Sequence, residues 1–230
     1  MSSDPGPVTP SVGWGVLHLF FRVSAGSDAQ AVGTAVKGAR EAGHQVVTFA
    51  VLGHKADIGV MALGPDLWVL RRLQTELVAA GLELVSSYVS MTEVSEYAAG
   101  IPEPMRQARL YPNLPPEGMT SICFYPMSKS RDVGRNWFSL PYDERKELML
   151  SHGAVGRQYS GRIVQLITGS TGVDDWEWGV TLFARVPDDL KEVVYNMRFD
   201  PASAVYAEFG PFFTGLLGEV DQLLEQLIRP

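Results

Sequence analysis

The feature that most constrains the fold of this chain is one order of predicted strands and helices that occurs twice along its 230 residues. Each half reads strand, helix, strand, strand, helix, strand, judged from β-branched runs and from helical spacing of apolar residues. In the first half the predicted strands cover 16–23, 44–52, 57–63 and 82–89, and the helices cover 28–42 and 65–80. In the second half the predicted strands cover 120–127, 162–168, 176–185 and 205–209, and the helices cover 141–151 and 188–197.

A short sequence match supports an internal duplication. Asp-Ile-Gly-Val at 57–60 aligns with Glu-Trp-Gly-Val at 177–180, and each is followed by apolar residues and a proline-led helix. The pattern predicts an α+β fold in which each half is an antiparallel sheet with helices on one side. Two such sheets can pack face to face, or close into a barrel, to bury their apolar sides.

Composition divides the chain into four parts. We expect a flexible N-terminal tail over 1–13, a first half over 14–97, a connector over 98–118 and a second half over 119–230. The connector holds five prolines, which predicts that it forms no regular element.

Charge and cysteine content exclude several classes of function. A net charge of −7 argues against nucleic acid as a main partner. No apolar run reaches the roughly 20 residues that span a bilayer, and the N-terminus lacks the regions of a signal peptide. We therefore expect a cytoplasmic protein without a membrane span. The single cysteine excludes an internal disulfide and the multi-cysteine metal patterns.

The most informative stretch for function is Cys-Phe-Tyr-Pro-Met-Ser-Lys-Ser-Arg at 123–131. In a strand, alternate residues share a face, so Tyr125, Met127 and Lys129 project together with Cys123. A phenol, a thioether and an ammonium make a poor hydrophobic core but a plausible wall for a redox-active, anionic ligand. An ordinary strand tyrosine is a half-buried structural residue, an interpretation that Met127 and Lys129 on the same face make less favoured for Tyr125. Taken alone, Lys129 near a strand end is best interpreted as a solvated charge.

His152 follows Leu148 by one helical turn and is followed by Gly153. We predict that the helix begins after Ser139 as its cap and ends at this histidine. Spacing alone favours a histidine that interacts with the carbonyl end of the helix. An imidazole on the covered side of a helix can also bind a haem iron.

Polar residues elsewhere in the second half and its surroundings complete the candidate set. Gln165 lies between two isoleucines on one strand face and needs hydrogen-bond partners if it is buried. Cations and hydroxyls that could bind carboxylates occur at Arg109, Arg198, Ser203 and Tyr88, although each alone is more often a surface or capping residue.

The run 123–131, the His-Gly pair at 152–153, the strand 163–170 and the segment 174–182 together resemble the chlorite dismutase-like superfamily, and within it the coproheme decarboxylases. The resemblance implies two ferredoxin-like halves that form an antiparallel α/β barrel within one chain, and homopentamers. It also implies hydrogen peroxide-dependent decarboxylation of coproheme III (iron-coproporphyrin III) to haem b, in which two propionates become vinyls and carbon dioxide is released.

Residue roles follow from the same resemblance. His152 is expected to bind the iron, Tyr125 to form a radical, and Lys129 to relay a proton and position a propionate beside Met127. Arg198 and Ser203 match the propionate-binding segment of the family, whereas Arg109 and Tyr88 match it less securely. A transient contact with a coproporphyrin ferrochelatase is a further expectation.

The sequence departs from two branches of this superfamily. Chlorite dismutases carry an arginine where this chain has Gln165, and one group of decarboxylases has a connector histidine that 98–118 lacks. Distal proton chemistry is therefore expected from Gln165, bound water or the substrate. A haem peroxidase, a chlorite-degrading enzyme and a non-catalytic haem-binding protein remain alternatives.

Overall fold

The computed structural model describes residues 6–98 and 100–227 and confirms the duplicated order. Its first half has the strands and helices β1 (Gly15–Arg22), α1 (Ala29–Glu41), β2 (Gln45–Val51), β3 (Ile58–Gly64), α2 (Leu67–Ala79) and β4 (Glu83–Thr92). Between the halves lie a short 3₁₀ helix, η1 (Glu96–Ala98), and α3 (Glu103–Leu110).

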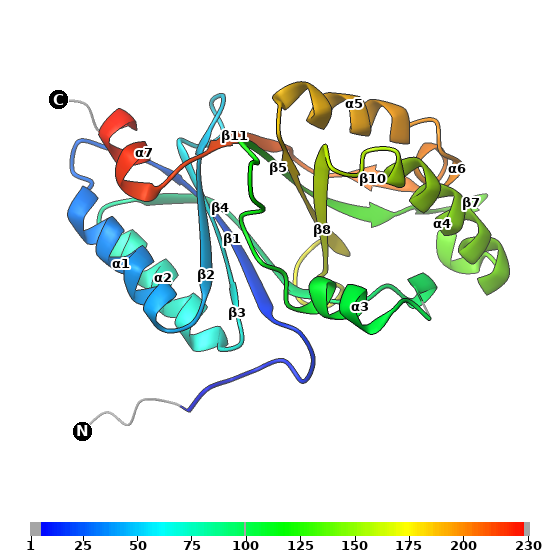
Figure 1. Ribbon diagram of the computed structural model, residues 1–230, viewed down its shortest axis with the longest axis horizontal. Coiled ribbons are helices and arrows are strands. Elements are labelled where there is room, and N and C mark those ends of the chain that lie inside the picture. Colours follow the sequence, from blue (N-terminus) through cyan, green and yellow to red (C-terminus); the bar gives the residue numbers. More distant parts are fainter. Residues whose placement is uncertain (1–5, 99, 228–230) are drawn as a thin grey trace.

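The second half repeats the arrangement with additions. Its elements are β5 (Ser121–Lys129), β6 (Arg131–Asp132), β7 (Arg135–Asn136), η2 (Trp137–Ser139), α4 (Tyr142–Arg157), β8 (Ile163–Gly169), β9 (Trp178–Ala184), α5 (Pro187–Met197), α6 (Pro201–Ala204), β10 (Ala207–Phe209), β11 (Phe213–Leu217) and α7 (Val220–Leu227). Figure 1 shows the first half with α1, α2 and α7 at one end of the molecule, and the second half with α4, α5 and α6 at the other.

The strands of both halves join into one closed antiparallel sheet. Within the described residues the order runs β5-β11-β2-β3-β1-β4-β8-β9, and β9 pairs again with β5, so the sheet closes on itself. The halves meet where β11 pairs with β2 and where β4 pairs with β8. The chain thus forms an antiparallel α/β barrel from two ferredoxin-like halves, as predicted.

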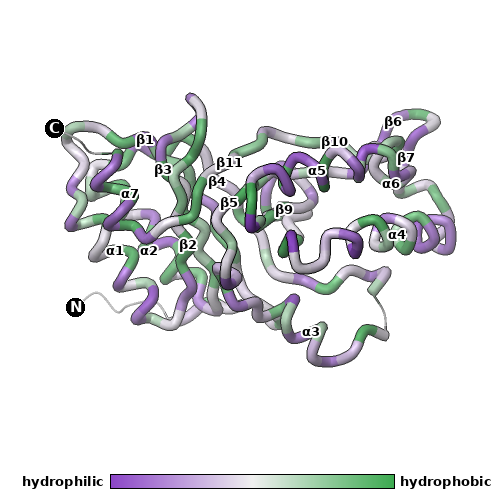
Figure 2. The backbone as a smooth tube through the Cα atoms, turned by 45° about the horizontal axis from the view of Figure 1, so that its top comes forward, coloured by the Kyte–Doolittle hydropathy of each residue, from purple (hydrophilic) through white to green (hydrophobic). Residues whose placement is uncertain are grey.

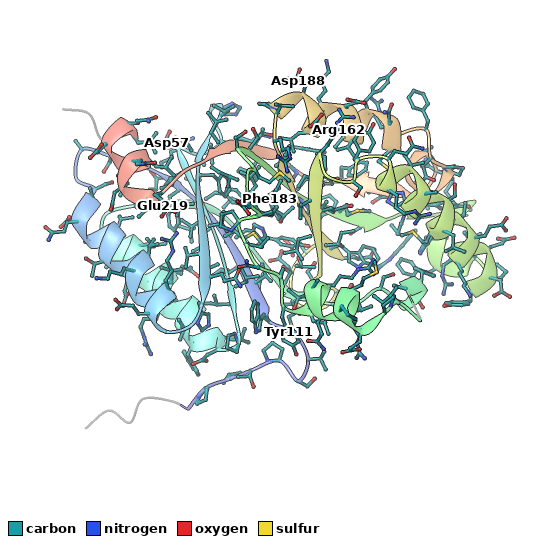
Figure 3. The ribbon with its side chains drawn as sticks, viewed as in Figure 1. Asp57, Tyr111, Arg162, Phe183, Asp188 and Glu219 are labelled. Carbon is teal, nitrogen blue, oxygen red and sulfur yellow. The ribbon has the colours of Figure 1, made fainter. Side chains whose placement is uncertain are left out.

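The barrel interior is filled by side chains. The apolar strands appear as hydrophobic stretches at the centre of Figure 2, and Phe183 lies at the centre of the side-chain view in Figure 3. Its buried neighbours include Phe20, Phe49, Phe124 and Phe213. An eight-stranded barrel is just wide enough for such a filling, so a large planar ligand must bind outside the barrel wall.

The aligned glycines occupy equivalent, crowded places. A Cβ atom on Gly59 of β3 would lie 2.1 Å from the Phe49 ring, and one on Gly179 of β9 would lie 2.8 Å from the Tyr88 ring. Each half therefore needs glycine where an aromatic ring crosses the strand.

The helices cover the outer faces of the two halves unequally. Helices α1, α2 and α7 pack on the first half and share one large apolar cluster with its strands. Helix α5 packs on β5 and β9, whereas α4 packs mainly against α5 and α6. None of the α4 side chains is buried.

Three local predictions were wrong. The connector contains α3, because Pro102 and Pro104 fall at its start, where a helix tolerates proline. Helix α4 continues past His152 to Arg157, and it begins after Pro141 without a side-chain cap from Ser139. The fourth strand of the second half is β11, to which the short β10 is an addition. The flexible tail over 1–13 stays a prediction: residues 1–5 lie outside the described residues, and the Val8 carbonyl accepts from the Leu67 amide at 2.9 Å.

Candidate functional site

Strand β5 presents the predicted face outside the barrel. Phe124 points into the barrel core, while Cys123, Tyr125 and Met127 pack with the second-half cluster beneath α5. Pro126 is tolerated in this central strand because β11 pairs only as far as Phe124 and β10 begins at Met127, so no partner strand needs its missing amide.

Tyr125 is buried and held by aromatic rings. Phe212 stacks on it with centroids 4.4 Å apart, and Phe209 meets it edge-on at 5.6 Å. Burial raises the pKa of the Tyr125 phenol well above its usual value, so the phenol keeps its proton at neutral pH. A neutral phenol that loses an electron must also lose this proton.

Lys129 is buried at the end of the same face. Its Nζ donates to the Ala202 carbonyl at 2.7 Å and lies 4.4 Å from the centre of the Trp137 ring. Burial lowers the pKa of Lys129 to about 8, against the opposing effects of Asp200 and Glu177. A lysine with this pKa can donate a proton as the ammonium and accept one as the neutral amine near neutral pH.

His152 projects from the middle of α4 towards α6. Its Nδ1 lies 2.8 Å from Oδ2 of Asp200, and the Ser203 hydroxyl lies 3.4 Å from the same nitrogen. The carboxylate assigns the Nδ1 proton, which leaves Nε2 as an acceptor. Burial lowers the pKa of His152, although Asp200 opposes this and Lys129 adds to it. The imidazole is therefore neutral at pH 7, the form that binds a metal.

Asp200 connects the two sides of the site and was not found from the sequence. It caps α6, accepts from the Ser203 amide at 3.2 Å, and keeps Oδ1 buried without a partner. The Ala202 carbonyl that holds Lys129 belongs to the same short helix. Helix α6 therefore places Lys129 and His152 relative to each other.

Gln165 lies on the outward face of β8 and is exposed. In the strand register Gln165 lies beside Leu182, and Leu182 lies beside Cys123. Ile167 and Tyr125 lie in the next such row across the sheet. Ile167 is 40% exposed on this face. The outer surface of β8 is thus apolar, with one amide and little cover.

The proposed carboxylate donors do not all gather here. Ser203 lies beside His152. Arg198 follows α5 and Arg109 ends α3, and both are exposed. Tyr88 points into the barrel, where its hydroxyl bonds Ser170 and burial raises its pKa to about 12. The structure therefore separates Tyr88 from the other candidates by the barrel wall.

A cavity of about 350 Å³ borders this site without including its reactive groups. It is lined by one face of α4, including Leu148 one turn before His152, and by Pro201 and Tyr206. It lies at the junction of α4 and α6.

An iron porphyrin fits this donor set. Within the described residues no group of three or more histidines, cysteines and carboxylates could hold a bare metal ion. Iron inside a porphyrin needs only an axial ligand. A metal-binding histidine typically donates its other nitrogen to a carboxylate, as His152 does to Asp200.

Comparisons with known proteins show the family of this chain. A family model described as chlorite dismutase matches residues 25–218. The chain belongs to the chlorite dismutase family. A solved structure described as a novel heme-binding protein from Thermus thermophilus is 35% identical, with a TM-score of 0.84 over 98% of this chain and 99% of that one.

Two other matches extend these comparisons. A protein of Natronomonas pharaonis, provisionally named heme-binding, is 42% identical over 92% of this chain, which spans only 40% of that relative's length. Chlorite dismutase from Candidatus Nitrospira defluvii shares the fold, with 19% identity, a TM-score of 0.76, and coverage of 96% of this chain and 98% of that one. Within the described residues, no helix combines the length and apolarity that crossing a membrane requires.

Proposed function

We propose that this protein uses hydrogen peroxide to convert iron-coproporphyrin III to haem b by oxidative decarboxylation of two propionates. One observation carries the proposal: a buried neutral phenol, Tyr125, shares one outward strand face with Lys129, and Lys129 lies within electrostatic reach of the carboxylate-bound His152.

The balance of the reaction defines what the site must do. Each propionate carboxylate, one peroxide and one proton give a vinyl group, one carbon dioxide and two waters. The bound iron porphyrin, reacting with peroxide, supplies the oxidising power. The protein must hold the iron, remove a hydrogen atom from the propionate and deliver a proton.

The chain has a residue for each task. His152 would hold the iron through Nε2, and Asp200 fixes the orientation of its ring. Tyr125 loses its electron and proton and then takes hydrogen from the propionate β-carbon. Lys129, whose pKa is about 8, delivers the proton and pairs with the propionate carboxylate. Gln165, on the uncovered face of β8, bonds peroxide or water without adding a cation.

The central test is Tyr125→Phe. The variant keeps the ring that packs on Phe212 and should bind ferric coproheme with an unchanged Soret shift. It should form no vinyl groups on peroxide addition, as followed by mass spectrometry of the porphyrin. Tyr195→Phe, at an exposed tyrosine of α5, is the matched control and should react normally. Loss of two carboxyl groups at the normal rate in Tyr125→Phe contradicts the radical role.

Haem binding without chemistry is a second candidate, since two relatives are named for haem binding. Stoichiometric binding of coproheme with no carbon dioxide release under peroxide would favour it. Rapid oxygen release from chlorite would instead favour chlorite dismutation.

A further inference from the structure

A group of oxidisable aromatic rings begins beside Lys129 and extends away from the site. Trp137, directly beneath the Lys129 ammonium, is only 2% exposed. Its ring centroid lies 6.3 Å from that of Tyr97. Tyr97 stacks on Tyr142 with centroids 5.8 Å apart, and Tyr142 is 41% exposed at the start of α4. Three neighbouring rings thus connect the site with solvent.

Tyr97 has a proton acceptor ready for its own oxidation. Its hydroxyl oxygen accepts from Nε of Arg145 at 2.9 Å. Burial, followed by the neighbouring Glu96 carboxylate, raises the pKa of Tyr97. Since Glu96 is exposed, it can take the phenol proton and later return it.

The surrounding charges determine where an oxidised ring can persist. The Lys129 ammonium lies over Trp137, and Arg145 lies 5.8 Å from the Tyr142 ring centre, so neither ring favours a radical cation. A neutral phenoxyl radical, formed by transfer of the proton to Glu96, avoids this repulsion. The oxidising equivalent therefore passes through Trp137 and persists as a neutral radical on Tyr97.

Among the described residues, the aromatic rings paired with Tyr125 are those of Phe209 and Phe212. Phenylalanine is far harder to oxidise than tryptophan or tyrosine. The ring contacts of Tyr125 therefore lead only to phenylalanines among the described residues, whereas those of Trp137 lead to Tyr97 and Tyr142.

We propose that Trp137, Tyr97 and Tyr142 form an electron-transfer route that passes oxidising equivalents unused by Tyr125 to one-electron donors, such as small phenols, at the protein surface. The inference rests on the proposed function, because peroxide acting on the bound iron porphyrin is the oxidant. Tyr97 gives one electron through Trp137 and its proton to Glu96. A donor at Tyr142 then gives one electron and releases its own proton, while Glu96 returns its proton to Tyr97. Two such rounds, with two donors, supply the two electrons and two protons that turn one peroxide into two waters.

The test maps where radicals form. Ferric coproheme-loaded protein is treated with peroxide and a nitroso spin trap, and the trapped residues are identified by peptide mass spectrometry. Wild type should carry the trap on Tyr97 and Tyr142. Trp137→Phe should lose both labels while still binding coproheme. Trp178→Phe is the matched control, because Trp178 lies beside Met127 in the strand register but bonds Glu93, and it should keep them.

A second variant tests the route in case substitution of the buried Trp137 disturbs folding. Tyr97→Phe removes one hydroxyl from a partly exposed ring and should abolish the label on Tyr142. Unchanged labelling in Trp137→Phe, or no label in wild type while vinyl groups form, overturns the route and leaves the proposed function intact. Failure to bind coproheme, or binding without any peroxide-driven product, overturns the proposed function and the route with it.

Discussion

The two halves of the barrel share one fold, but the side chains on the outer faces of their sheets differ in kind. Gly59 and Gly179 occupy the same place in each half, so the strand registers define equivalent positions. By this register Leu19 of β1 corresponds to Tyr125 of β5. Val46 of β2 corresponds in the same way to Gln165 of β8.

The helices show the same difference. Helix α1 buries Val32, Ala35, Val36 and Ala39 against the first half. Its counterpart α4 buries no side chain and packs mainly on its helical neighbours. One half uses the face as core, and the other places a phenol and an amide there beneath incomplete cover. A functional site can therefore be recognised as the place where a duplicated fold departs from its own apolar copy.

Amide hydrogen exchange should show the largest difference between the halves. Without ligand, α4 should exchange much faster than α1, because buried apolar contacts determine local opening. Ferric coproheme at a hundred times its dissociation constant should slow α4 exchange by about 100-fold, since binding adds about 2.7 kcal/mol to the opening free energy. His152→Ala at the same coproheme concentration should lose most of this slowing. Equal exchange rates of α1 and α4 without ligand would contradict the proposed difference between the two halves.

Matched valine truncations should differ in cost. Val36→Ala in α1 removes two buried methyl groups and should lower the free energy of unfolding by about 2 kcal/mol. Val155→Ala in α4 removes the same atoms from a partly exposed position and should cost less than about 0.5 kcal/mol. Urea unfolding of both variants checks this, and similar costs would show that α4 is held as firmly as α1.

Much of the fold could be predicted because each half repeats local signals. Strand alternation predicted that Phe124 and Tyr125 face opposite sides of the sheet, and the structure places Phe124 inside the barrel and Tyr125 outside. Gly59 and Gly179 indicated the duplication, and the structure shows that both avoid a ring.

The rest depended on context that local patterns do not contain. Gly153 suggested a helix end, yet α4 continues through it, so tertiary packing overrode the weak helix propensity of glycine. Asp200 lies 48 residues from His152, and no spacing rule relates a cap of one helix to an imidazole of another. Tyr88 faces inward because its strand pairs with His18, a contact that its own sequence does not specify.

Asp200→Asn should weaken the contact between Asp200 and His152, the feature that most distinguishes the second half. Removing the negative charge behind the imidazole should lower coproheme affinity by about tenfold, the usual cost of losing such a partner. A Soret titration measures this. Asp189→Asn is the control, because Asp189 is an equally buried carboxylate of α5 that pairs with Arg162 outside the site. It should change stability without changing affinity, and equal affinity losses would assign both effects to general unfolding.

Lys129 gives the smallest but most specific difference. The same numbering offset, continued two residues beyond the paired positions, relates Lys129 to the apolar Val23 of the first half. The folded pKa of Lys129, about 8, lies below its ordinary value of 10.5. Between these pH values the unfolded chain binds more protons, so this residue makes stability rise with pH. Wild type should therefore gain about 1 kcal/mol between pH 8 and 9 relative to Lys129→Met, as measured by urea unfolding at each pH. The burial penalty is fully present below pH 8, so Lys129→Met should also be the more stable protein at pH 7. Parallel stability curves for the two proteins would mean that Lys129 is solvated, and would remove it from the proton chemistry of the site.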